Sequence, residues 1–242
     1  VGALDFGDHA GLDLNSERLR WFDWRLKGID TGMASEPPVK LFVMGAHVWR
    51  FENEWPLART KYRPYYFHSG GQANTLDGDG VLGVQKPGDE PVDRFVYDPG
   101  NPAPSPEDGF SSMIWAIGPC DQRSVEMRED VLVYTTPPLE RDIEATGPVE
   151  VVLYAASSAV NTDFTAKLVD VDQSGKAINI SSGILRAPLR NSLERWEELV
   201  PGQPTRLVIE LTPTANTFQA GHCVRLEVSS SDFPRYDRNL NT

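Results

Sequence analysis

The sequence lacks the features that would place it in several large classes of protein. It has two cysteines, Cys120 and Cys223, which are too few for a disulfide framework, and their small or apolar neighbours favour two buried reduced thiols over a bridge. No apolar run approaches the ~20 residues of a membrane-spanning helix, so no membrane partner is expected. No signal peptide is present, which favours a cytoplasmic location, although the chain begins at Val1 rather than Met and a preceding segment is expected.

Positive charge is also scarce. The chain has 23 Lys and Arg against 35 Asp and Glu, a formal net charge of −12, and no basic cluster. Binding to nucleic acid depends on basic patches that release counterions, so a nucleic-acid partner is excluded. The acidity is interpreted as serving solubility. Hydrophobic residues make up 40% of the 242 residues, which is enough for a buried core.

The usual catalytic signatures are missing. There is no Gly-x-Ser-x-Gly nucleophile turn, no His-Glu-x-x-His or Cys-x-x-Cys zinc motif, and no phosphate-binding Gly-x-x-x-x-Gly-Lys-Ser/Thr loop. We therefore expect no catalytic residue, no metal and no cofactor in this chain. The position of His222 at the start of a strand predicts a hydrogen-bonded structural histidine, and His9 could join a catalytic triad only with partners from elsewhere.

Two further patterns have a structural and a functional interpretation. Asp77 and Asp79 resemble part of a calcium loop, but the remaining ligands are missing at the required spacing, which favours a solvated turn. The aromatic residues at 62 and 65–67 could form a platform for a sugar, but packing in the core of a sandwich is the favoured use.

The stretch 147–186 contains the clearest secondary-structure signal. Apolar and polar residues alternate over 149–155, 164–168 and 178–180, which predicts strands with one buried face. Asp172 and Gly175 suit the start and the left-handed position of a tight turn, so residues 164–185 are predicted to form a hairpin.

Short strand patterns recur from residue 59 onward, where helical periodicity is almost absent. The predicted strands cover 61–67, 93–97, 130–135, 149–155, 164–171, 177–185, 205–211 and 224–229, and 193–200 could form one helical turn. Many short alternating strands predict a β-sandwich, with a jelly roll as the leading topology.

Residues 1–58 have a different character. Asn15 is predicted to cap a helix over 16–27 that Gly28 ends, and this helix is apolar on two faces. The apolar run 39–44 suits a strand buried on both faces, as in a parallel sheet. A helix followed by such a strand is typical of α/β folds, so residues 1–58 are inferred to be the end of a larger α/β domain.

Several motifs resemble the CocE/NonD serine hydrolases, the family of cocaine esterase and X-Pro dipeptidyl-peptidase. The motifs lie in the order of the family over nearly the whole chain, and the resemblance is closer to the esterase branch. They comprise 40–45 with Trp49-Arg50 and Trp55-Pro56, Tyr97-Asp98-Pro99, Gly118-Pro119 with 121–123, and, most specifically, 157–171 and 221–234.

The resemblance implies a serine esterase or dipeptidyl-peptidase of three parts. These are an α/β-hydrolase domain with a Ser-His-Asp triad, a helical cap, and a C-terminal jelly roll similar to galactose-binding domains. The triad lies upstream in the family pattern, so no residue here matches it. Residues 1–58 would be the C-terminal remnant of the hydrolase domain, and 59–242 the X-Pro dipeptidyl-peptidase C-terminal-like jelly roll, without its closing strand.

The same resemblance implies a role for one loop. The aligned family segment packs on the acyl part of the substrate, so Phe110, Ser111, Ser112 and Met113 are expected to form a wall of the substrate pocket. The implied partners are the upstream domain with its cap and a small ester or acyl substrate. The sequence leaves open whether the protein forms a homo-oligomer.

Two hypotheses follow. Either the chain is the C-terminal portion of a serine hydrolase that acts on ester or amide bonds and is inactive alone, or it is a stand-alone β-sandwich binding module for a ligand such as carbohydrate. The order of the motifs favours the hydrolase.

Overall fold

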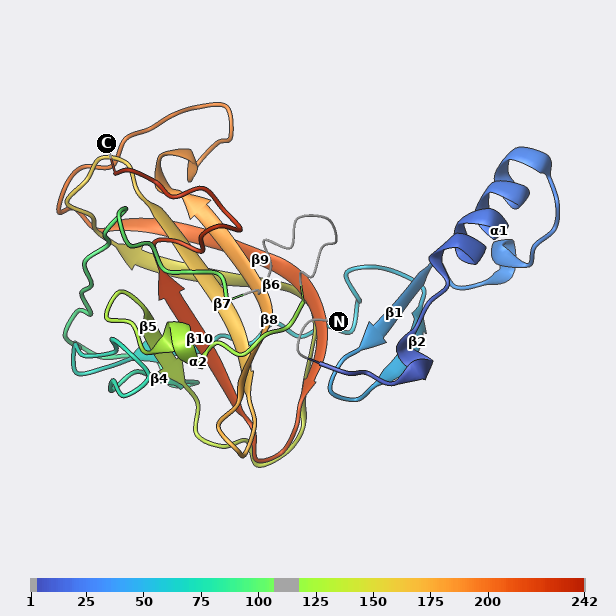
Figure 1. Ribbon diagram of the computed structural model, residues 1–242, viewed down its shortest axis with the longest axis horizontal. Coiled ribbons are helices and arrows are strands. Elements are labelled where there is room, and N and C mark those ends of the chain that lie inside the picture. The colour runs from blue at the N-terminus through green and yellow to red at the C-terminus, as the bar shows by residue number, and fades with distance from the viewer. Residues whose placement is uncertain (1–3, 107–117, 242) are drawn as a thin grey trace.

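The computed structural model describes residues 4–106 and 118–241, and it is mainly β (Figure 1). Its two α-helices are α1 (Leu14–Lys27) and α2 (Arg123–Glu126). Its strands are β1 (Val39–Val43), β2 (Val48–Glu52), β3 (Tyr66–His68), β4 (Val81–Gly83), β5 (Leu132–Thr135), β6 (Ile143–Ala155), β7 (Asp163–Val171), β8 (Ala177–Arg186), β9 (Thr205–Phe218) and β10 (Cys223–Ser229).

The strands from β3 onward form a β-sandwich of the jelly-roll class. One sheet has the order β3-β4-β5-β10-β7-β8, and the long antiparallel pair β6-β9 packs across it. The predicted hairpin of 164–185 is confirmed as β7-β8. Gly175 has φ +83°, and Asp172 Oδ1 accepts hydrogen bonds from Ser174 N at 2.7 Å and Lys176 N at 3.0 Å.

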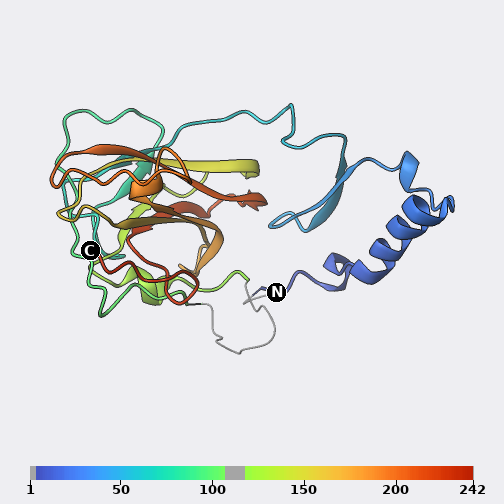
Figure 2. The same ribbon diagram turned by 90° about the horizontal axis from the view of Figure 1, so that it is seen from above.

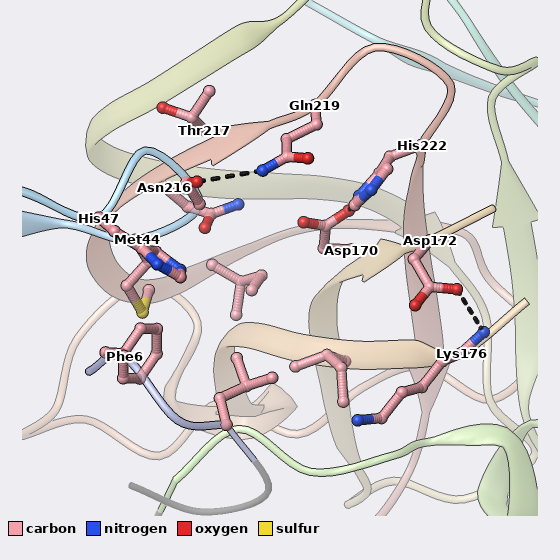
Figure 3. A pocket seen from close by; sticks show the side chains of 14 residues that line it. Phe6, Met44, His47, Asp170, Asp172, Lys176, Asn216, Thr217, Gln219 and His222 are labelled. Carbon is pink, nitrogen blue, oxygen red and sulfur yellow. Dashed lines mark hydrogen bonds and ion pairs between the residues drawn. The ribbon is translucent and has the colours of Figure 1, made fainter. Parts of the chain in front are cut away.

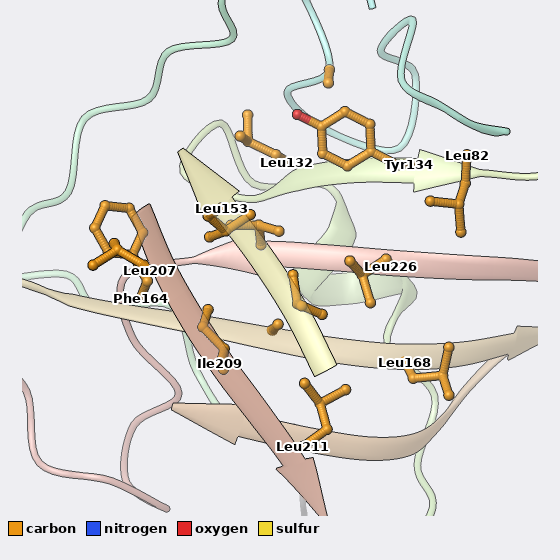
Figure 4. Packing of buried hydrophobic residues seen from close by; sticks show 14 of the residues in the cluster. Leu82, Leu132, Tyr134, Leu153, Phe164, Leu168, Leu207, Ile209, Leu211 and Leu226 are labelled. Carbon is orange, nitrogen blue, oxygen red and sulfur yellow. The ribbon is translucent and has the colours of Figure 1, made fainter. Parts of the chain in front are cut away.

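The alternating apolar residues face one another between the two sheets (Figure 4). On the six-stranded sheet, Phe164 and Leu168 come from β7 and Leu226 comes from β10, while Leu207 and Ile209 come from β9. Full burial of a side chain of this size contributes about 1.5–3 kcal/mol, so this layer supplies much of the stability of the sandwich. Tyr134 and Phe67 extend the core, with ring centroids 4.5 Å apart.

Helix α1 starts earlier than predicted. Asp13 is the N-cap rather than Asn15, because Asp13 Oδ1 accepts hydrogen bonds from the backbone of Asn15 at 3.0 Å and Ser16 at 3.2 Å. Gly28 ends the helix with φ 69°, as predicted. No residue of α1 is buried, so both apolar faces of the helix lie open in this chain.

The expectation of a strand in a parallel sheet at 39–44 is wrong for the described structure. β1 pairs antiparallel with β2, and only Val43 among its residues is buried. Gly45 (φ 75°) and His47 (φ 55°) turn the chain back on itself, so the nearest available partner is the next stretch of sequence. In Figures 1 and 2 this hairpin and α1 extend away from the sandwich.

Two local predictions also fail. Residues 93–97 form no strand, because the carboxylate of Asp93 accepts hydrogen bonds from Ala73 N at 2.9 Å and Tyr134 Oη at 2.7 Å. Side-chain bonds of this kind replace the backbone ladder. Residues 193–200 form no helical turn, because Leu199 N donates to the distant carbonyl of Val160 at 2.8 Å.

Candidate functional site

The predicted pocket wall, Phe110, Ser111, Ser112 and Met113, lies outside the described residues. The chain on either side of that stretch is held firmly. On the N-terminal side, Ser105 N donates to Phe233 O at 2.6 Å, and Phe233 N donates to Ala103 O at 3.0 Å. On the C-terminal side, Cys120 N donates to Asn179 Oδ1 at 2.7 Å. Asn179 N also donates to Cys120 O at 3.3 Å, so the backbone groups on both flanks are hydrogen-bonded to the sandwich.

A cavity of about 180 Å³ opens where the β1-β2 turn meets the sheet (Figure 3). Phe6 and Met44 line one side of it, and Asp170, Lys176 and His222 lie across from them. The cavity thus combines an apolar wall with a charged wall, and its volume is below the range of about 300–1,000 Å³ that is usual for small-ligand sites.

The most organised part of the charged wall is a histidine–carboxylate pair. His222 Nδ1 lies 2.8 Å from Asp170 Oδ1, which confirms the prediction of a hydrogen-bonded structural histidine. Burial raises the pKa of Asp170, while the contacts with His222 and Asn216 act in the opposite direction.

Among the described residues, the imidazole of His222 is hydrogen-bonded to the Asp170 carboxylate and to no serine, threonine or cysteine side chain. The described residues that line the cavity include no serine and no cysteine. A triad needs a nucleophile within hydrogen-bonding reach of the imidazole, so the cavity does not support acyl transfer by itself.

The other histidines are also engaged. His9 Nε2 donates to the carbonyl of His47 at 2.9 Å, and His68 Nδ1 lies 2.8 Å from Glu90 Oε1. The Glu90 carboxylate raises the pKa of His68. Since no serine or cysteine takes part in these hydrogen bonds, they give no sign of a catalytic set.

The calcium-like stretch acts as a turn. Asp79 Oδ2 accepts from Gly70 N at 2.8 Å and Asp79 Oδ1 accepts from Gln72 N at 3.2 Å, so its carboxylate is used by the backbone. Across residues 4–106 and 118–241, no group of three or more His, Cys, Asp or Glu side chains is arranged to hold a metal ion.

The aromatic stretch divides between two uses. Tyr65 and Phe67 pack against the core, as the favoured interpretation predicted, whereas Tyr62 is exposed. Cys120 and Cys223 form no disulfide among the described residues, and both are half-buried rather than buried as predicted. Within the described ranges, no helix is long and apolar enough to span a membrane.

Residues 31–242 match the family of X-Pro dipeptidyl-peptidase C-terminal non-catalytic domains. The chain belongs to this family. Its jelly-roll strands and the motifs quoted above fall within the matched range.

The curated relatives of this C-terminal domain include esterases. Cocaine esterase of Rhodococcus sp. is 43% identical over 222 residues, which cover 92% of this chain and 39% of the relative. A protein named putative serine esterase from Mycobacterium bovis is 31% identical over 243 residues, which cover 91% of this chain and 36% of that protein. The chain thus spans less than two fifths of the length of these relatives.

Solved structures agree with the assignment. An α-amino acid ester hydrolase superposes with a TM-score of 0.77 at 30% identity, covering 92% of this chain and 38% of that one. An aminopeptidase from a Thaumarchaeota archaeon superposes with a TM-score of 0.78 at 28% identity, covering 100% of this chain and 41% of the other. The chain is therefore similar to the C-terminal region of CocE/NonD-type hydrolases.

No local sequence pattern predicts the cavity at the β1-β2 hairpin. Its charged wall comes from Asp170, Lys176 and His222, and its apolar wall from Phe6 and Met44. The charged residues at the turn of the 164–185 hairpin are the sequence feature that could have pointed to the charged wall of the cavity. The turn of the β1-β2 hairpin, which closes the other side, was not predicted.

Proposed function

We propose that this chain is the C-terminal portion of a serine hydrolase that acts on ester or amide bonds. The observation that carries the proposal is the 43% identity to cocaine esterase over 92% of the chain. In a triad mechanism, serine attacks the carbonyl, histidine transfers the proton, and water releases the acyl group. The chain would support the fold of the enzyme and contribute no member of the triad.

The open surface of α1 supports an upstream partner. Leu19, Phe22 and Leu26 lie 59%, 49% and 75% exposed. Soluble proteins rarely leave apolar side chains grouped in this way without a covering partner. An α/β-hydrolase domain with a helical cap, encoded upstream of Val1, would cover this surface, and residues 1–58 would be its C-terminal part.

Phe110, Ser111, Ser112 and Met113 would form one wall of the acyl pocket. The support is the family resemblance together with the anchored flanks, since Ser105 and Cys120 are both tied to the sandwich by backbone hydrogen bonds. A site is more selective when the chain on both sides of it is fixed. The role would be the selection of the acyl group, where a change of one methylene is worth roughly 1–3 kcal/mol.

A stand-alone binding module is the second candidate. The cavity between Met44 and His222, with its apolar and charged walls, is the observation that favours it. Binding of a small sugar by the 242-residue chain would support this candidate. The sugar-platform version is less favoured, because Tyr65 and Phe67 are used in the core.

The test uses the whole protein, expressed from the reading frame that continues upstream of Val1. Treatment with a fluorophosphonate probe, followed by mass spectrometry, identifies the reactive serine. We expect one labelled serine upstream of Val1, and none in the 242-residue chain treated alone. Stoichiometric labelling of a serine within residues 1–242 would overturn the proposal.

A further inference from the structure

Five charged side chains are buried together on the face of the six-stranded sheet that points away from the sandwich core. Strand β10 supplies Arg225 and Glu227, β7 supplies Lys167, α2 supplies Glu126, and Asp232 follows β10. Each is at most 8% exposed. The alternation of β10 explains the placement, because Val224, Leu226 and Val228 point into the core and leave the charged residues on the opposite face.

Two ion pairs account for most of the charge. Arg225 Nη1 lies 2.7 Å from Glu126 Oε2, and Arg225 Nε donates to Thr135 Oγ1 at 2.8 Å. Lys167 Nζ lies 2.8 Å from Asp232 Oδ1 and donates to Gln122 Oε1 at 3.2 Å. These contacts join α2 and the residues just before it to the sheet.

Glu227 is the carboxyl group of this cluster that forms no ion pair within 4.0 Å, although the Lys167 ammonium acts on it at longer range. Three carboxyl groups face two cations, and the carboxyl group of Glu126 is close enough to Glu227 to raise the pKa of Glu227. Both Glu126 Oε1 and Glu227 Oε1 are buried without a hydrogen-bond partner among the described residues. Two carboxylates cannot donate to each other, so one proton between them would supply the missing donor and balance the charge.

The surroundings favour that proton. Burial raises the pKa of Glu227 to about 8, the Lys167 ammonium opposes the rise, and Glu126 and Asp232 add to it. The remaining charged or titratable neighbours are the Cys120 thiol beside Lys167 and the Arg123 guanidinium near Glu126. Arg123 is exposed and paired with Asp121, so it leaves the charge of the buried group unbalanced.

We propose that Glu126 and Glu227 share one proton in the folded domain, and that this proton keeps α2 docked on the sheet, so that the docking is sensitive to alkali. Loss of the proton leaves two adjacent buried carboxylates. The repulsion then separates α2 from β10, and with it the segment that begins at Cys120.

The direction of the pH effect follows from linkage. The pKa of Glu227 is raised on folding from an ordinary value of about 4.5, so the folded state holds the proton more tightly than the unfolded state. The stabilisation is complete below the unfolded pKa. It is lost as the pH rises through the folded pKa, so stability should decline between about pH 5 and pH 8.

The first experiment compares the wild-type chain with Glu227→Gln, which keeps a hydrogen bond to Glu126 but cannot ionise. Unfolding by urea is measured from pH 5 to pH 9, and Glu150→Gln, at an exposed position of β6, is the matched control. Between about pH 5 and pH 8, we expect the folding equilibrium constant of the wild type to fall by up to about tenfold per pH unit relative to that of Glu227→Gln. Glu150→Gln should follow the wild type. Parallel curves for wild type and Glu227→Gln would overturn the proposal.

Two further readouts keep the test decisive. At pH 9, amide exchange of Val125 and Glu126, whose backbone N–H groups bond to Gln122 O, should be faster in the wild type than in Glu227→Gln. Equal rates would overturn the docking claim. If Glu227→Gln fails to fold, infrared spectroscopy of the wild type decides. The carbonyl band of a protonated carboxyl group should be present at pH 7 and lost by about pH 9, and its absence at pH 7 would overturn the proposal.

Discussion

Gly45 and Thr217 lie against each other at the point where the β1-β2 hairpin joins the sandwich. Met44 N donates to Ala215 O at 2.9 Å, and Thr217 N donates to Met44 O at 2.8 Å. A Cβ at Gly45 would lie 2.0 Å from the carbonyl oxygen of Thr217. The hairpin is therefore docked by direct backbone contact, which only glycine permits here.

Gly45→Ala should destabilise the chain more than Gly202→Ala. Both glycines have φ +75°, so both variants carry the strain of a left-handed alanine, about 1–2 kcal/mol. A Cβ at Gly202 meets nothing within 4 Å, whereas at Gly45 it would force the hairpin away from β9. Urea unfolding monitored by far-UV circular dichroism measures the difference. Equal losses for the two variants would contradict this account of the contact.

The sandwich could be predicted because its strands bury one face. Phe164, Leu168 and Leu226 alternate with residues that point away from the core, so a period of two is visible in the sequence. The turn at Asp172 and Gly175 carries its own signal. Strands β6 and β9 extend well beyond their predicted ends, because their outer parts pair with each other across residues of mixed polarity.

The features that the sequence did not predict share one physical cause. In each of them, contacts between residues far apart in the sequence decide the structure, and the local pattern of apolar and polar residues does not. Asp93 is bound by groups 20 and 41 residues away, at Ala73 and Tyr134, so its apolar neighbours never pair as a strand. The cavity beside His222 depends on the docking of Gly45 against Thr217, which no local sequence signal encodes. The buried charges of β10 have the same explanation, since their partners lie on α2 and β7.

His222→Ala should cost more stability than His68→Ala. Each imidazole places Nδ1 2.8 Å from a carboxylate, but Asp170 is the more buried partner, with its side chain 15% exposed against 32% for Glu90. Removing the donor takes from the Asp170 carboxylate its hydrogen bond with His222, at a cost of about 1–3 kcal/mol. Surface pairs such as His68–Glu90 contribute about 0–1 kcal/mol. Urea denaturation at pH 6 compares the two, and a larger loss for His68→Ala would contradict the ranking.

The 242-residue chain should self-associate through α1. Phe22 and Leu26 are exposed, and each large apolar side chain left in water forgoes roughly 1.5–3 kcal/mol of burial. Sedimentation over a range of concentrations should show association that Phe22→Ser with Leu26→Ser reduces. Leu193→Ser, at a position that is 86% exposed on the sandwich, is the control and should leave the association unchanged. A monomer with uniformly slow amide exchange over residues 16–44 would refute this prediction.

The last prediction concerns the proposed acyl pocket and requires the whole enzyme with its upstream part. Ser112→Phe should reduce the space for the acyl group and shift the ranking of esters by kcat/KM toward short chains. Met113→Ala should enlarge the space and shift the ranking toward bulky acyl groups, because a methylene-scale change in fit is worth roughly 1–3 kcal/mol. Val96→Ala, at a position that is 85% exposed, is the control and should keep the wild-type ranking. If both pocket variants fold, label fully with a fluorophosphonate and keep that ranking, residues 110–113 do not contact the acyl group. A loss of labelling together with a loss of activity would instead indicate damage to the catalytic serine's surroundings, so the ranking is compared only among variants that label fully.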